Sequence, residues 1–408
     1  MEVLYERCCG LDIHKDTVVA CLRTPGVGAT REQTVRTFAT MTADLLALGD
    51  WLAEAGCTHV AMESTGVYWK PLFNLLEERF TLILANAYDV KGRPGRKTDV
   101  QDCVWLADLL QHGLLRPSFV PTRPQRELRE LVRYRTSLVA ERADEVNRLQ
   151  KTLEGANLKL GSVASNIMGK SGRAMLAALV DGQTDATVLA DLAEGKLRTK
   201  LPALRKALEA RMRPHQRFLL GHQLRHIEEL EQHIEDVSAE IAARLADQEE
   251  VLTRLDSVPG VGRRTAELFL AEAGLDMAQF PSSKHFASWV ALCPGHHESA
   301  GKQRSGRIRK GNVYLKTALV EAAQAAGRTK GTSLSALHQR LAARRGRKRA
   351  TVAVAHRLAV LLYCLVRDGT TYEEREESTR AAAQAAKRER RLIEELRGRG
   401  YEVLRKAG

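Results

Sequence analysis

The sequence has few cysteines and no paired-cysteine motif. Its seven cysteines are spread over 408 residues, mostly inside apolar runs. No Cys-x-x-Cys pair and no cysteine–histidine ligand spacing is present, so a structural zinc site is not expected. Reduced, buried thiols in a cytoplasmic protein explain these residues better than disulfides do.

Long apolar runs are also lacking. We find no run of the roughly 18 residues that a membrane-spanning helix needs. A strand-like pattern begins at about residue 7, which leaves no room for a cleaved signal peptide. We therefore expect a cytoplasmic protein that does not bind a membrane.

Acidic residues are outnumbered by basic ones. The chain has 63 Lys and Arg against 50 Asp and Glu, a net charge of +13. Such a balance favours polyanionic partners such as nucleic acid, although charge alone leaves open a basic protein that binds none. The 44% hydrophobic content indicates a folded protein, and the length predicts two or three domains.

The first 115 residues alternate between strand and helix patterns. Strand-like runs lie at 7–13, 17–23, 34–39, 58–62 and 80–85, and helical stretches lie near 41–55, 67–79 and 98–113. Three strands with short links, followed by alternating helices and strands, predict an α/β domain with an RNase H-like fold.

Four carboxylates stand at chemically useful places in that pattern. Asp12 and Glu63 end two apolar strands, and Asp99 and Asp102 fall where a loop becomes a helix. Carboxylates at strand ends, together with an i, i+3 pair on one helix face, can converge on divalent metal ions. This geometry suits two-metal phosphodiester chemistry, so we expect the chain to cut or rejoin nucleic acid.

The rest of the chain is predicted to be mainly α-helical. Residues 116–123 resemble a linker, and 126–160 and 214–246 have long helical patterns. These two helices predict a coiled-coil arm or a dimerisation element, and helices of an ordinary bundle remain an alternative. We expect domains at 1–123, 124–250 and 251–349, followed by a charged helical tail at 350–408.

Two further segments are typical of phosphate binding. Residues 255–266 resemble a helix-hairpin-helix, in which Gly260 and Gly262 would let backbone amides approach a phosphate. Residues 344–349 form a dense basic cluster, for which a solvated charge run is the alternative.

Serines and cations are interleaved in residues 293–316. Ser299 and Ser305 lie there, and either hydroxyl would be a nucleophile if its deprotonation were assisted. From composition alone, we favour phosphate binding or helix capping for both serines. The predicted nucleic-acid-binding residues are Lys97, Gly260, Gly262, Lys302, Arg304, Arg307, Arg309 and Lys310. His296 and His297 show no partner at ligand spacing.

Several of these motifs together resemble the IS110 family of transposases. The matching segments run in family order through nearly the whole chain. They are Gly10–Lys15, Met62–Gly66, Gly95–Asp102, Val258–Gly262, Ser299–Lys302 and Lys310–Asn312.

The resemblance implies a DNA transposase of an insertion sequence, with a RuvC-like DEDD domain and a C-terminal transposase domain. Asp12, Glu63, Asp99 and Asp102 would bind Mg²⁺. A serine would attack DNA; Ser299 takes that position, and Ser305 offers a rival alignment. The family also implies donor and target DNA and a structured noncoding guide RNA. Because strand exchange needs at least two active sites, we expect a homodimer or homotetramer.

Two rival functions stay open. A junction nuclease that uses metal-activated water shares the four acids but needs no serine. A non-catalytic nucleic-acid-binding scaffold needs neither the acids nor a metal.

Overall fold

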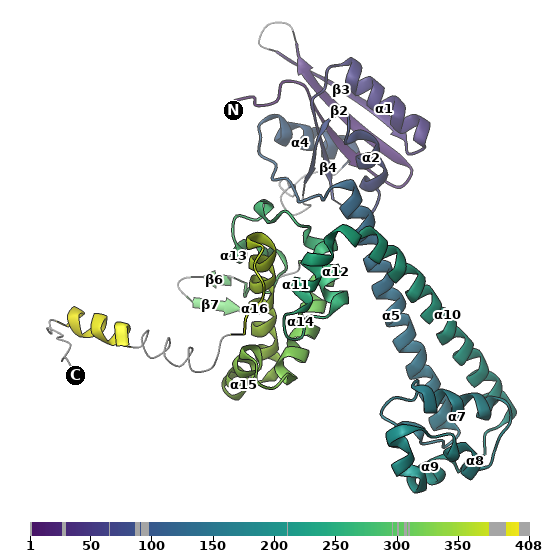
Figure 1. The fold of residues 1–408 in the computed structure, drawn as a ribbon. Helices are drawn as coiled ribbons and strands as arrows, with labels where there is room; N and C mark the ends of the chain where they lie inside the picture. Colours follow the sequence, from purple (N-terminus) through teal and green to yellow (C-terminus); the bar gives the residue numbers. More distant parts are fainter. Residues whose placement is uncertain are drawn as a thin grey trace. The chain divides into compact units, whose positions relative to one another are not determined.

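The computed structural model describes residues 2–26, 30–64, 66–85, 90, 98–209, 211–295, 297–299, 302–305, 308, 311–374 and 389–399. The chain divides into two compact units, Met1–Arg123 and Pro124–Gly408 (Figure 1). Four of the predicted nucleic-acid-binding residues lie outside the described residues: Lys97, Arg307, Arg309 and Lys310.

The first unit is built on a five-stranded sheet of order β3-β2-β1-β4-β5. The strands β1, β2 and β3 pair antiparallel, while β4 runs parallel to β1 and β5 runs parallel to β4. This arrangement confirms a mixed α/β unit. The strands are β1 Cys8–Ile13, β2 Thr17–Pro25, β3 Arg31–Ala39, β4 His59–Glu63 and β5 Thr81–Ala85, and the helices are α1 Thr42–Glu54, α2 Trp69–Leu76 and α4 Asp99–Gln111.

Helices cover both faces of this sheet because alternate strand residues are apolar on both sides. Cys9 and Leu11 of β1 pack with α1 and α2. Cys8, two positions before Gly10 and four before Asp12, faces the other way and packs against α4. The unit buries five cysteines, none of them in a disulfide: Cys8, Cys9, Cys21, Cys57 and Cys103.

The second unit begins with two long helices, α5 Arg123–Gly155 and α10 Pro214–Arg244. They run antiparallel, since Arg135 lies beside Ser238 while Arg142 pairs with Glu231 (Figure 1). A small apolar cluster of Leu138, Leu230 and Ile234 joins them midway. The predicted helices at 126–160 and 214–246 are therefore confirmed as helices.

Short helices close the far end of this pair around a separate core. They are α6 Leu160–Val163, α7 Lys170–Val180, α8 Ala186–Asp191, η1 Gly195–Lys200 and α9 Leu201–Leu208. Their core residues include Leu160, Met175, Leu176, Leu189 and Leu204, and they pack with Leu149 of α5 and Leu220 of α10.

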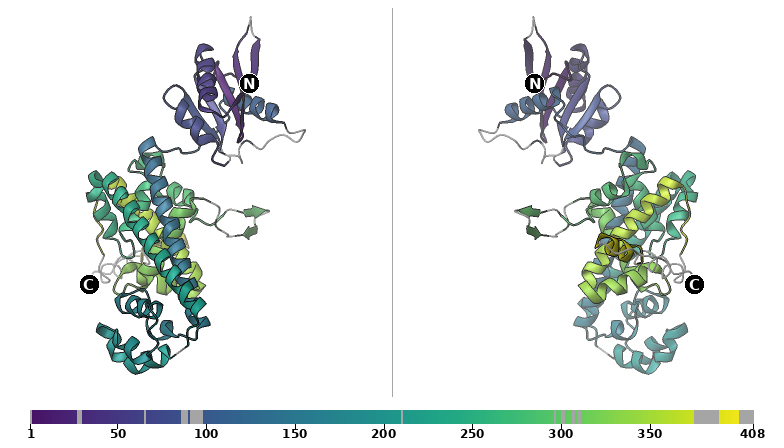
Figure 2. Two further views of the ribbon diagram at one scale, coloured as in Figure 1. Left: turned by 90° about the vertical axis from the view of Figure 1, so that its right-hand side faces the viewer. Right: turned by 90° about the vertical axis from the view of Figure 1, so that its left-hand side faces the viewer.

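The remaining elements form a helical bundle with a short β-hairpin. They are η2 Ala246–Gln248, α11 Glu249–Asp256, α12 Arg263–Ala273, η3 Met277–Gln279, α13 Ser283–Trp289, β6 His297–Ser299, β7 Lys302–Ser305, α14 Val313–Arg328, α15 Ser333–Arg345 and α16 Arg347–Asp368. Figure 2 shows β6 and β7 as a separate hairpin attached to these helices.

The predicted boundary between residues 349 and 350 falls inside α16 and needs correction. Val354, Leu358 and Leu362 of this helix are fully buried in the same core as Phe269 and Phe286. The basic residues at its start give the segment the look of a solvated tail, while its apolar face completes the bundle. The bundle therefore extends to residue 368.

The apolar composition of α16 also bears on the expected absence of membrane-length runs. By length and composition this helix would suffice to cross a bilayer. Half of its apolar window is buried inside the protein, where α16 contacts α11, α13, α14 and α15. A core helix of a bundle has this pattern, and packing accounts for its hydropathy.

Candidate active site

The parallel pairing of β1 and β4 sets two predicted acids side by side. Leu11 pairs with Met62, so the next residues on the two strands are Asp12 and Glu63. Neighbouring strands lie about 4.8 Å apart, and residues in register point to the same face. Both side chains are half-buried. The two acids therefore share one edge and one face of the sheet.

Gly10 brings α4 onto the same face. A Cβ at Gly10 would lie 2.4 Å from the amide nitrogen of Ala107 and 2.5 Å from the carbonyl oxygen of Cys103. Only a residue without a side chain permits this approach. Asp99 lies about one turn before Cys103 and Asp102 directly before it, both in the first turn of α4. The close packing at Gly10 thus carries both acids toward the end of β1.

His14 links the strand to the helix. Its Nε2 lies 3.1 Å from Asp12 Oδ2 and 3.5 Å from Asp99 Oδ1. Burial raises the pKa of the Asp12 carboxyl; His14 opposes this shift, and Asp102 and Asp99 add to it. The carboxylates of Asp99 and Asp102 are therefore close enough to Asp12 to act on its charge.

These donors fit a divalent cation. Asp12, His14 and Asp99 offer ligand atoms within 4.8 Å of one another. Glu63 and Asp102 fall outside that group among the residues that the structure describes. Carboxylate oxygens are the preferred ligands of Mg²⁺, and an imidazole nitrogen also suits Mn²⁺ or Zn²⁺.

A purely structural role for the helix acids has support as well. Asp99 and Asp102 lie in the first turn of α4, where negative charge favours the helix, and Thr98 caps it by accepting from the Gln101 amide at 3.3 Å. Such a role leaves unexplained why Asp12 lies with them at a partly buried strand end. His14 was missed by the sequence reasoning, although its place two residues after Asp12 is the period of a strand face.

The predicted serines lie at opposite ends of the β6–β7 hairpin. Ser299 pairs with Lys302 beside the turn, and Ser305 pairs with His297 at the other end. The two pairs are three residues apart along β7, or about 10 Å at 3.3 Å per residue. Ser299 and Ser305 are therefore two separate candidate positions along the hairpin backbone. Of the side chains in 297–307 the structure describes none.

Packing requires a glycine at one position of the turn before α12, residue 260. Gly260 has a φ of +88°, and a Cβ there would lie 2.3 Å from the carbonyl oxygen of Ala322 in α14. Gly262 is exposed and begins α12, with no atom within 4 Å of a Cβ. Packing therefore explains Gly260, while Gly262 leaves open space beside the helix start.

Two family models match the chain. A model for DEDD transposases of IS110 type, described as "Transposase", covers residues 9–158. A second, described as "Transposase IS116/IS110/IS902 family", covers residues 252–339. The first range contains the acidic cluster, and the second contains the β6–β7 hairpin.

Curated relatives carry similar descriptions. The "Probable family 20 transposase" of Pseudomonas aeruginosa is 28% identical over 321 residues, which cover 77% of this chain and 85% of the relative. The "Transposase for insertion sequence element IS1111A" of Coxiella burnetii is 35% identical over 143 residues, 34% of this chain and 39% of the relative. The "Pilin gene-inverting protein" of Moraxella bovis is 27% identical over 125 residues, 30% of this chain and 38% of the relative.

Proposed function

Since the chain belongs to the IS110 family of transposases, we propose that it cuts and rejoins DNA strands with a serine nucleophile and Mg²⁺. The observation that carries this proposal is the acidic cluster at the end of β1. Asp12 is partly buried there, in register to meet Glu63 and within reach of Asp99 through His14.

In this proposal, Asp12, Glu63, Asp99 and Asp102 hold the cation, with His14 beside them. When bound, a divalent cation supplies charge stabilisation to phosphate oxygens during strand cleavage. The residues' own contribution is to gather carboxylates at a half-buried place: burial raises the pKa of Asp12, and Asp102 and Asp99 add to that shift. The strand order β3-β2-β1-β4-β5 supports assigning the unit to the RuvC-like members of the RNase H-like folds.

Ser299 is the proposed nucleophile. Its oxygen would form a bond to phosphorus as the bond to the departing 3′ oxygen breaks. The serine proton passes to a general base and from there to the departing 3′ oxygen, which leaves as a hydroxyl. Rejoining reverses these steps with a 3′ hydroxyl from another strand, so no external energy source is needed.

The basic surfaces would hold nucleic acid. Gly262 at the start of α12 and the cations of the β7 segment, Lys302 and Arg304, are proposed phosphate contacts. A noncoding guide RNA would pair with donor and target DNA and read their sequences. The α5–α10 pair would act as an antiparallel coiled-coil arm in a homodimer or homotetramer, since strand exchange needs more than one active centre.

A covalent-adduct trap tests the serine directly. The purified protein would be incubated with junction DNA of its element, the flanking RNA and Mg²⁺, and then run on a denaturing gel. Ser299→Ala and Ser305→Ala are a matched pair, because each removes one serine hydroxyl from the same hairpin, at backbone positions about 10 Å apart. We expect an adduct with the wild type and Ser305→Ala, and none with Ser299→Ala.

The other outcomes are equally informative. Loss with Ser305→Ala alone would move the nucleophile to the far end of the hairpin. DNA cleavage without any adduct would favour a nuclease that uses metal-activated water. Cleavage that persists in Asp12→Ala would remove the acidic cluster from the mechanism.

A further inference from the structure

The hairpin that carries Ser299 is fastened at its base. Pro294 and Ile308 form an antiparallel bridge that closes it below the strands. Gly311 then packs tightly against the end of α13, since a Cβ there would lie 2.7 Å from the carbonyl oxygen of Trp289. The chain leaving the hairpin is thereby led to the start of α14.

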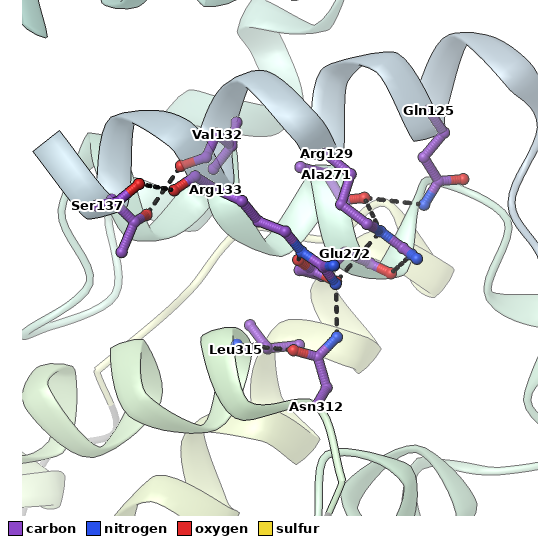
Figure 3. Close-up of polar contacts among 10 residues, drawn as sticks. Gln125, Arg129, Val132, Arg133, Ser137, Ala271, Glu272, Asn312 and Leu315 are labelled. Atoms are coloured by element: carbon purple, nitrogen blue, oxygen red, sulfur yellow. Dashed lines mark hydrogen bonds and ion pairs between the residues drawn. The ribbon is translucent and has the colours of Figure 1, made fainter. Parts of the chain in front are cut away.

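Asn312 occupies that start and makes two different hydrogen bonds. Its Oδ1 accepts from the Leu315 amide at 3.0 Å, which caps α14. Its Nδ2 donates to Oε2 of Glu272 at 2.7 Å (Figure 3). A helix cap requires only an acceptor, and serine or aspartate serves as well. The bond to Glu272 therefore explains why this cap is an amide.

Glu272 is held from the other side by α5. Its side chain is fully buried, and Arg133 donates to it through Nε at 2.6 Å and through Nη2 at 2.8 Å (Figure 3). Arg129 adds an ion pair at 3.2 Å and donates to the Glu272 carbonyl oxygen at 2.6 Å. A buried carboxylate gripped by two arginines has one position, because moving it would leave charges unpaired.

Arg129 is a partly buried member of this arrangement. Burial lowers the pKa of Arg129 to about 10, with Glu272 opposing the shift and Arg133 adding to it. Arg129 thus remains charged at neutral pH. Arg133 also lies over the Tyr314 ring of α14, 4.5 Å from its centre.

We propose that Asn312 is a positioning residue for the Ser299 hairpin, which it ties through Glu272 to Arg129 and Arg133 of α5. The inference rests on the proposed function, because it gives the placement of Ser299 a chemical purpose. A nucleophile displaced by about 1 Å can lose about a hundredfold in rate. Asn312 would keep the base of the hairpin from such a shift.

Three variants separate the effect of the α14 cap from the effect of the hydrogen bond between Asn312 and Glu272. Asn312→Ser keeps an acceptor for α14 and removes the donor to Glu272. Asn312→Asp also keeps the cap but sets a second carboxylate against Glu272. Thr332→Ala is the control, since it removes the cap of α15, where Thr332 accepts from Ser335 at 3.2 Å.

We expect Asn312→Ser to lower the single-turnover rate of adduct formation by about tenfold to a hundredfold at saturating DNA. The DNA concentration for half-saturation should stay within about twofold, because no DNA contact is removed. Backbone amides of 297–305 should exchange faster with deuterium. Asn312→Asp should lower the rate at least as much, because its carboxylate faces that of Glu272, and Thr332→Ala should change neither measurement.

Wild-type adduct rate and wild-type exchange in Asn312→Ser would overturn the proposal. An equal loss in Thr332→Ala would also overturn it, because general stability would then account for the effect. If the wild type forms no adduct, the serine assignment fails, and the exchange data alone decide whether Asn312 anchors the hairpin.

Discussion

Gly10 and Asp12 shape the acidic cluster in opposite ways. Gly10 contributes by lacking a side chain, which lets the backbone of α4 approach β1 at Ala107. Asp12 contributes a carboxylate that burial disfavours in its charged form. Gly10 thus brings Asp99 and Asp102 close to β1. Asp12 adds a partly buried negative charge beside them, which is unfavourable unless a cation is bound.

A methyl group at Gly10 should therefore disturb the cluster without touching an acid. Gly10→Ala must push α4 away from β1, which should cost about 1–3 kcal/mol of unfolding free energy and weaken divalent-cation binding. Urea denaturation and calorimetric titration with Mn²⁺ would measure both effects. Gly161→Ala is the control, because a Cβ there meets no atom within 4 Å. Unchanged cation affinity in Gly10→Ala would contradict the role of this close packing.

The raised pKa of Asp12 predicts a pH-dependent effect on stability. The native state holds this proton more tightly than the unfolded state does, so stability falls as pH rises through the folded pKa and stays lowered at neutral pH. Asp12→Asn should thus raise Tm at pH 7 in EDTA, and the gain should shrink as the pH is lowered toward about 4. A divalent cation should raise Tm in the wild type alone. A variant that melts below the wild type in EDTA would disprove this assignment.

Among single residues, the sequence allowed prediction of the carboxylates that lie at strand ends. The positions of Asp12 and Glu63 at the ends of β1 and β4 could be predicted because each ends an apolar run. Glu272 could not be predicted, because its burial depends on Arg133, which lies 139 residues earlier in the chain. A glutamate in a helix is otherwise typical of a solvated surface.

Among the elements, periodic patterns predicted type and approximate bounds. The five strands of the first unit and the helices α5 and α10 all lie within a few residues of the predicted runs. The end of the bundle could not be predicted, because the cations at the start of α16 precede an apolar face that only α11 and α13 to α15 explain. Tertiary packing, rather than local pattern, sets that boundary.

The middle of the α5–α10 pair should be its weakest part. Its apolar contact there is the small cluster of Leu138, Leu230 and Ile234, which lies between larger cores at the two ends. Leu230→Ala should cost about 2–5 kcal/mol and accelerate amide exchange along both helices. Leu219→Ala on the same helix is the control, because Leu219 is 47% exposed and its loss should matter little. Equal effects of the two variants would contradict a structural role for the cluster.

On the scale of the whole molecule, part of the excess positive charge, which is +13 for the chain, gathers at the corner between α15 and α16. The residues there are exposed: Arg340, Arg344, Arg345, Arg347, Lys348 and Arg349. The first turn of α16 contains no acidic residue and no side-chain cap. Cations at a helix start oppose its dipole, so a polyanion would relieve an unfavourable arrangement.

Neutralising this corner should alter the salt dependence of DNA binding. Each phosphate contact contributes about 0.9 to the slope of log affinity against log salt concentration. Arg344→Gln, Arg347→Gln and Lys348→Gln together should reduce that slope by about 2 to 3. The control variant changes Lys151, Lys196 and Lys206 to Gln, which lowers the net charge equally, from +13 to +10. Parallel slopes for the two triple variants would exclude a specific role for the corner.

The cysteines of the unaltered chain can report the unfolding of each of the two units. Burial raises the pKa of Cys8 to about 11 and that of Cys57 to about 12, so these thiols react slowly while the first unit is folded. Five of the seven cysteines belong to that unit, whereas the half-buried Cys293 and Cys364 belong to the second. Alkylation followed by peptide mass spectrometry would therefore time the unfolding of each unit separately, in the unaltered protein and with DNA present.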